Sequence, residues 1–180
     1  MKRKIINPVI KDTVTFLQTS RETDSLVSEL ECTLMPKGRN FPHYHKTFSE
    51  TFTAIDGALG LRLAGKKTMI LQPNETYTVQ KNQVHSFFNP GNHEIRFNIR
   101  ITPGHEGFEQ TLRILYGLAA DGLTNHKSVP KSLQHIAIIG NLSDSYLPGL
   151  MKILSPVFNH LAHKAKRQGL EKALIEKYCS

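Results

Sequence analysis

Three side chains that commonly bind metal ions stand within eight consecutive positions of this chain, at His43, His45 and Glu50. Alternate side chains of a β-strand point to the same face, so His43 and His45 share a face and Tyr44 points to the other. Two imidazoles on one face, followed closely by a carboxylate, form a chelating pattern. The spacing H-x-H-x4-E therefore predicts a metal site carried by strands, in a mainly β protein.

A second segment, from Asn74 to Asn89, carries a fourth metal-binding side chain at His85. Together the two segments resemble the paired motifs of the cupin superfamily, G-x5-H-x-H-x4-E-x6-G and G-x5-P-x-G-x2-H-x3-N. The resemblance spans residues 25–105. It implies a double-stranded β-helix, or jelly-roll barrel, with a metal held by His43, His45, Glu50 and His85.

The departures from these motifs concern the backbone and leave the four predicted ligands intact. The first glycine of the first motif is displaced by one residue to Gly38, and the proline of the second motif is Gln80. Asn74 and Asn82 replace the two glycines of the second motif. Asparagine is the non-glycine residue that best tolerates the left-handed conformation of a tight turn, so both replacements keep the turn chemistry.

The ligand types narrow the choice of metal. Three imidazoles and one carboxylate suit one divalent transition metal (Fe, Mn, Co, Ni, Cu or Zn), whereas a calcium site needs more oxygen ligands. Four protein ligands on a six-coordinate ion leave two positions for water, substrate or dioxygen, as a catalytic metal requires. In four-coordinate zinc geometry the same site would be closed and structural.

Two phenylalanines share strand faces with predicted ligands. Phe52 has the parity of Glu50, and Phe87 has the parity of His85. Both are candidates to line an apolar pocket beside the metal, although plain core packing is the commoner role of such residues.

A polar face on a later predicted strand is formed by Arg96, Asn98 and Arg100. If this face points into the barrel, it would bind a carboxylate or phosphate substrate, because arginine grips such groups through two parallel hydrogen bonds. If it points outward, it is the solvated side of a sheet, which is the usual place for charged residues.

Alternation of apolar and polar residues predicts strands through residues 1–105. One strand runs from Leu26 to Leu34, with Leu26 on its buried face. Residues 59–71 predict a hairpin around Ala64–Lys67, and a later strand runs from Ile95 to Ile101. Many short strands separated by turns indicate a jelly roll, which we place in residues 1–105.

Helical periodicity replaces the alternation in residues 106–180. One helix is predicted around Phe108–Ala119, and a second is opened by Pro130. A third follows an apolar stripe from Leu150 to Ala165; in an alternative interpretation, Ser155 is an N-cap before Pro156 and splits this stretch into a short turn and a helix over residues 156–168. We expect this extension to pack on the barrel instead of forming an independent domain, and to be structural.

Composition excludes several classes of protein. The formal charge is +8, but its basic clusters at residues 2–4 and 164–167 lack interleaved aromatic residues and any DNA-reading motif, so nucleic-acid binding is not expected. No run of about 18 apolar residues exists, so no membrane span is expected. Cys32 and Cys179 form neither a disulfide framework nor a CxxC pair, and the basic start lacks an apolar core behind it. A cytoplasmic location follows.

Two classes of function remain open. The first is a metal-dependent enzyme that acts on a small organic molecule, since cupins include dioxygenases, isomerases and decarboxylases. The second is a non-catalytic sensor or binding protein that uses the metal to hold a small-molecule ligand. We also expect a homodimer, because the predicted N-terminal strand with Val14 and Phe16 has an open edge that either a partner's strand or the helical extension could cover.

Overall fold

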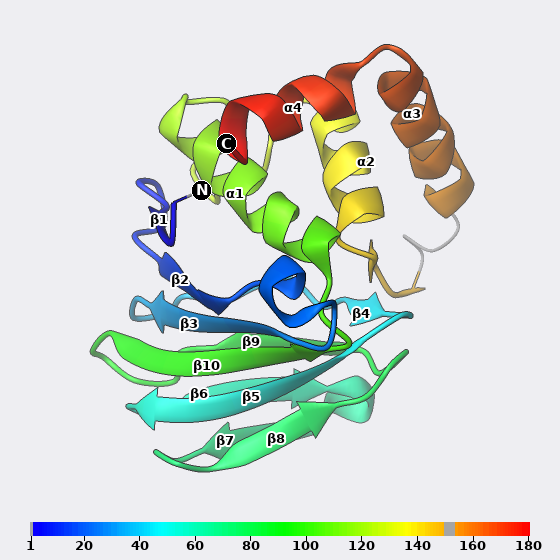
Figure 1. The fold of residues 1–180 in the computed structure, drawn as a ribbon. Helices are drawn as coiled ribbons and strands as arrows, with labels where there is room; N and C mark the ends of the chain where they lie inside the picture. Colours follow the sequence, from blue (N-terminus) through cyan, green and yellow to red (C-terminus); the bar gives the residue numbers. More distant parts are fainter. Residues whose placement is uncertain (1, 150–153) are drawn as a thin grey trace.

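The computed structural model describes residues 2–149 and 154–180, and two facing antiparallel sheets form its β-part (Figure 1). The strands are β1 (Lys4–Ile6), β2 (Thr13–Gln18), β3 (Ser28–Leu34), β4 (Tyr44–His45), β5 (Ser49–Asp56), β6 (Leu59–Leu63), β7 (Thr68–Leu71), β8 (Thr76–Val79), β9 (His85–Phe88), β10 (Ile95–Thr102) and β11 (Ser145–Tyr146). The larger sheet has the order β1-β2-β3-β10-β5-β8, the smaller one β7-β6-β9, and β4 pairs with β11. The predicted jelly-roll barrel is confirmed.

The core lies between the two sheets because each strand turns its apolar positions inward. In β10, burial alternates strictly, with the odd positions from Ile95 to Ile101 buried. Its neighbour β3 alternates in the same way from Ser28 to Leu34. Each large apolar side chain buried here stabilises the fold by about 1.5 to 3 kcal/mol. The largest fully buried side chains of this core are Phe16, Phe48, Phe52, Phe97, Leu30, Leu34, Leu59, Leu61 and Ile101.

The start of β3 corrects one prediction. Leu26 is 71% exposed and lies outside the strand, which begins at Ser28. The reason is a turn after the short 3-10 helix η1 (Ser20–Thr23): the Thr23 hydroxyl donates to the main-chain oxygen of Val27 at 2.6 Å and accepts from its nitrogen at 3.1 Å. These local bonds compete with strand pairing.

The turns agree with the sequence. The predicted hairpin forms from β6 and β7 around the 3-10 helix η2 (Ala64–Lys66). Asn74 and Asn82 both adopt the left-handed conformation, with φ of +72° and +64°. This is the conformation that the replaced glycines would adopt most easily.

Four α-helices follow the barrel in the described residues and lie together beside β1 and β2 (Figure 1). They are α1 (Glu106–Ala120), α2 (Leu133–Leu142), α3 (Ser155–Arg167) and α4 (Leu170–Tyr178). Helix α1 packs on two sides: Phe108, Leu112 and Tyr116 contact the barrel core, whereas Ile114 and Leu118 belong to a second core among the helices. The extension therefore shares α1 with the barrel.

Two predicted helix starts are wrong. The second helix begins at Leu133 and not at Pro130, because the Ser132 side chain caps it and accepts from the main-chain nitrogen of His135. Ser155 is the first residue of α3 and not its cap, and Leu154 is the N-cap. Two members of the predicted stripe, Leu150 and Ile153, lie outside the described residues.

The N-terminal edge also differs from the prediction. Val14 and Phe16 are buried, and β1 pairs along the outer side of β2, so the chain covers this edge itself. Within residues 2–149 and 154–180, no helix combines the length and apolar character needed to cross a membrane.

Candidate metal centre

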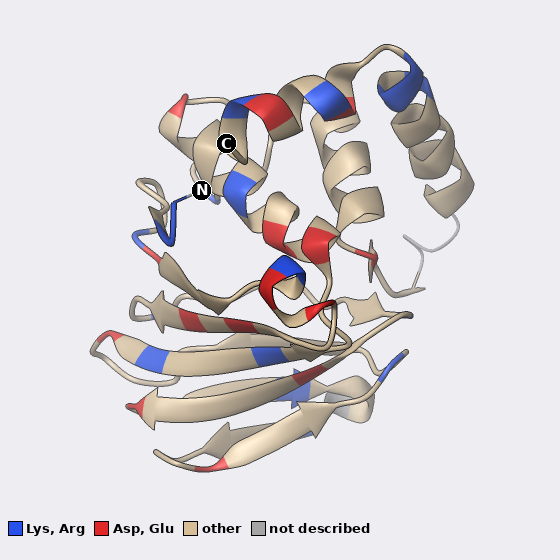
Figure 2. Ribbon diagram, viewed as in Figure 1, with Lys and Arg blue, Asp and Glu red and all other residues tan. Residues whose placement is uncertain are grey.

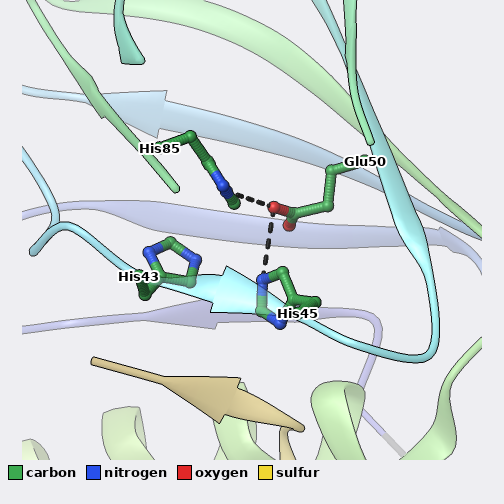
Figure 3. Close-up of side chains that lie close together, drawn as sticks. All are labelled: His43, His45, Glu50 and His85. Carbon is green, nitrogen blue, oxygen red and sulfur yellow. Dashed lines mark hydrogen bonds and ion pairs between the residues drawn. The ribbon is translucent and has the colours of Figure 1, made fainter. Parts of the chain in front are cut away.

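The structure brings the four predicted ligands into one cluster, in which their ligand atoms all lie within 4.8 Å of one another (Figure 3). Glu50 projects inward from β5, His45 from β4 and His85 from the first position of β9. His43 precedes β4 and pairs with His85: each main-chain nitrogen donates to the other residue's oxygen at 2.9 Å. The fold thus brings His85 to the segment of residues 43–50, although Glu50 and His85 are 35 residues apart.

Main-chain carbonyls set the tautomer of all three imidazoles. In each ring Nδ1 lies within hydrogen-bond distance of a carbonyl oxygen, which only accepts, so Nδ1 carries a proton and Nε2 is the nitrogen turned toward the cluster. The pairs are His43 with Phe41 at 2.8 Å, His85 with Gln83 at 3.0 Å and His45 with Asp144 at 3.1 Å.

The strongest contact within the cluster joins His85 Nε2 to Glu50 Oε2 at 2.6 Å, with both side chains buried. Burial lowers the pKa of His85, but the hydrogen bond and the charge of Glu50 outweigh it and raise the pKa above its usual value. Burial would raise the pKa of Glu50, yet the neighbouring imidazoles, above all His85 through its hydrogen bond, hold that pKa well below its usual range. Both His85 nitrogens thus face acceptors, Nδ1 the Gln83 carbonyl and Nε2 the Glu50 carboxylate, and this geometry favours the imidazolium form.

Burial, followed by the neighbouring charge of His85, lowers the pKa of His43 to about 4. His43 is therefore neutral near pH 7, which is the form that binds metals. Its side chain is half-buried, whereas His45, Glu50 and His85 are buried.

One buried atom shows that the cluster fits a cation. His45 Nε2 is buried and has no hydrogen-bond partner in the described part of the chain, yet it lies 3.3 Å from Glu50 Oε2. Because Nδ1 holds the proton, two lone pairs face each other across this gap, and such an arrangement is favourable only with a positive charge between them. Neighbouring ligands on an octahedral ion, each roughly 2.1 Å from it, stand about 3 Å apart. The donor set thus suits a divalent transition metal.

The two candidate pocket phenylalanines lie in the barrel core. Phe52 is fully buried, with its ring centroid 6.0 Å from that of His85. Phe87 is partly buried and packs 5.3 Å from Phe97. Both lie on the same side of the strands as the cluster, and their contact with a bound molecule stays a prediction.

The polar face of β10 points outward. Figure 2 shows acidic positions on β3 beside basic positions on β10, and the pairs are Arg96 with Glu31 at 3.8 Å and Arg100 with Glu29 at 3.3 Å. Asn98 has the same parity and is half-buried between these pairs. The alternative in which Arg96, Asn98 and Arg100 line a substrate pocket is therefore wrong, because the apolar positions of β10 take the inner face.

Sequence reasoning missed the contribution of the helical extension to this cluster. Phe108 of α1 meets the His45 ring edge-on at a centroid distance of 6.0 Å, and Asp144 supplies the acceptor for His45 Nδ1. Asp144 also contacts the two residues that follow His45. His45 and Asp144 are 99 residues apart, and no local pattern marks the pairing.

Comparisons with known proteins find similarity in the barrel part of the chain. Residues 30–101 match a family model described as "Cupin domain". Among solved structures, the chain is similar to a predicted oxalate decarboxylase from Thermotoga maritima (17% identity, covering 52% of this chain and 81% of that one, TM-score 0.49). It is also similar to KdgF from Halomonas sp. (12% identity, covering 56% of this chain and 86% of that one, TM-score 0.48). A third similar structure is the polyketide cyclase RemF from Streptomyces resistomycificus (19% identity, covering 54% of this chain and 68% of that one, TM-score 0.47). Comparison with curated proteins finds no match.

Proposed function

We propose that the chain, whose residues 30–101 match the cupin family model, holds one divalent transition metal at His43, His45, Glu50 and His85 and uses it on a small organic molecule. The observation that carries the proposal is the buried pair of His45 Nε2 and Glu50 Oε2, whose lone pairs face each other. Bound there, the ion would supply Lewis-acid polarisation, an orienting template or a dioxygen site. Dioxygenase, isomerase and decarboxylase chemistry all fall within this proposal.

The protein's own residues support this function by their positions. Phe48 stacks on His45 at a centroid distance of 4.2 Å, and Phe52 lies beside His85, so apolar rings pack against two of the four ligands. In such surroundings the Glu50 charge acts more strongly on a cation than it would in water. The proton on His85 Nε2 must leave when a metal takes its place, so binding should release a proton.

A second candidate is a non-catalytic sensor or binding protein that holds its ligand through the metal. The rings packed against His45 and His85 favour it, because Phe48 and Phe52 offer no acid–base chemistry. Both candidates share the metal, and they differ in whether the bound molecule is changed. Mass spectrometry of candidate organic acids and sugars after incubation with metal-loaded protein separates them.

The metal itself is tested by elemental analysis of protein purified without nickel resin. We expect about one first-row transition metal per chain when the site is filled. The double variant His45→Ala/His85→Ala should lose that metal. The matched control is His160→Ala/His163→Ala, which removes two exposed histidines from α3. Full occupancy in the first variant, or equal loss in both, would contradict the ligand assignment.

Two further features belong to the proposal. We propose a homodimer, because β1 and β8 end the larger sheet with unpaired edges that a second copy would cover. We also propose that the chain works in the cytoplasm, consistent with two buried free cysteines, Cys32 and Cys179.

A further inference from the structure

The segment Asp144–Tyr146, which follows α2, joins the helical extension to the strand that carries His45. Strand β11 pairs antiparallel with β4, so that Ser145 lies opposite His45 and Tyr146 opposite Tyr44. The two tyrosine rings stack at a centroid distance of 5.4 Å. A strand of the extension therefore lies directly against the strand that carries one predicted ligand.

Asp144 makes the polar contacts of this junction through both its side chain and its main chain. Its carboxylate oxygen Oδ2 accepts from the main-chain nitrogens of Lys46 at 2.7 Å and Thr47 at 2.8 Å, and from the Thr47 hydroxyl at 2.7 Å. Hydrogen bonds to an ionised carboxylate are about twice as strong as neutral ones. Its main-chain oxygen lies 3.1 Å from His45 Nδ1. One residue thus contacts three successive positions, His45 to Thr47.

The backbone of Asp144 is suited to this double role. Its φ is +51°, in the left-handed region that aspartate tolerates better than most other residues with a side chain. The conformation lets the carbonyl and the carboxylate approach the same segment. Alanine at this position would lose the carboxylate and would disfavour that backbone.

His45 differs from the other two histidines in the position of the carbonyl that accepts from its Nδ1. His43 and His85 use carbonyls two residues earlier in their own segments, whereas the acceptor for His45 lies 99 residues away. The turn from Lys46 to Phe48 also separates His45 from Glu50 in sequence. Anchoring this turn fixes both the His45 ring and the place where the chain re-enters the barrel toward Glu50.

We propose that Asp144 is a positioning residue of the metal centre, and that through it the helical extension sets the tautomer of His45 and the metal affinity of the barrel. Residues that orient metal-ligating histidines commonly change metal affinity about 10- to 100-fold when they are removed. The inference rests on the proposed metal-binding function. It assigns the extension a role beyond covering the barrel surface.

The test compares Asp144→Ala with Asp24→Ala in the full-length protein. Asp24 is a matched control, because it also has positive φ, at +50°, and is an exposed residue at the C-terminal end of η1, outside the segments that carry the ligands. Co²⁺ affinity is measured by competition with a chelator, and the His45 tautomer by ¹⁵N NMR of the metal-free protein. We expect Asp144→Ala to weaken Co²⁺ binding about 10- to 100-fold and to release His45 from the Nδ1–H tautomer. Asp24→Ala should change neither quantity.

If Asp144→Ala does not fold, a second pair of variants tests whether Asp144 positions the metal centre. Thr47→Val removes the hydroxyl that donates to Asp144, and Thr47→Ser keeps it at an exposed position. Weaker Co²⁺ binding in Thr47→Val, restored in Thr47→Ser, supports the inference, and equal affinities overturn it. Wild-type affinity and tautomer in a folded Asp144→Ala variant also overturn it. If the wild-type protein binds no Co²⁺, the proposed function fails, while the His45 tautomer in metal-free Asp144→Ala still decides whether Asp144 positions the ring.

Discussion

Asp12 is a carboxyl group buried beside the barrel core, and its ionisation should cost stability. Asp12 is 9% exposed, and its Oδ1 accepts a long hydrogen bond of 3.4 Å from the main-chain nitrogen of Met35. Burial is the main cause that raises the pKa of Asp12 from 3.8 to about 7; the Met35 bond opposes the rise, and the charge of Glu94 adds to it. Cys32 and Tyr116 also lie near this carboxyl.

The sign of the pH dependence follows from proton binding. Between pH 3.8 and about 7 the folded protein keeps a proton on Asp12 that the unfolded chain has lost. The free energy of unfolding therefore falls as the pH rises through this window, and the full cost is present above it. A shift of about three pKa units corresponds to about 4 kcal/mol.

Asp12→Asn removes the ionisation while keeping the shape and an acceptor for Met35. We expect the variant to be more stable than the wild type by about 4 kcal/mol at pH 8 and by under about 1 kcal/mol at pH 4. For a chain of this size, the gain at pH 8 would raise the melting temperature by roughly 8 to 16 °C. Urea unfolding at both pH values measures the difference.

Asp24→Asn is the matched control, because Asp24 is exposed at the end of η1. It should leave the difference between pH 4 and pH 8 as it is in the wild type. A gain for Asp12→Asn that is the same at both pH values would refute the reasoning, since the benefit would then not come from ionisation.

Three other predictions concern the extension and the assembly. Deleting residues 106–180 should lower the melting temperature, because Phe108, Leu112 and Tyr116 contact the barrel core; calorimetry showing no change would contradict this. Gly117→Ala would place a methyl group 2.2 Å from the Tyr178 ring and should destabilise the fold by about 1 to 3 kcal/mol while the metal content stays at the wild-type level. Light scattering should give twice the chain mass of 20.3 kDa, and a mass of 20.3 kDa at micromolar concentration would argue against the homodimer.

The spacing of residues along the chain was sufficient to predict the barrel strands and to identify the candidate ligands. The alternation in β3 and β10 and the hairpin of β6 and β7 depend on neighbouring residues, because side chains alternate with a period of two whatever the strand pairs with. The left-handed turns at Asn74 and Asn82 are likewise a property of one residue and its turn. Local spacing put His43, His45 and Glu50 in one segment, whereas the convergence of His85 with them was implied by the resemblance to the cupin motifs, since His85 lies 35 residues from Glu50.

Tertiary structure decided what depends on residues far apart in the chain. Strand parity puts Arg96, Asn98 and Arg100 on one face, but the burial of the opposite face and the pairing with β3 decide that this face is the outer one. The support of His45 by Asp144 spans 99 residues and depends on how α2 and β11 return to β4. The geometry of such a contact is set by the packing of whole elements, which local periodicity does not encode.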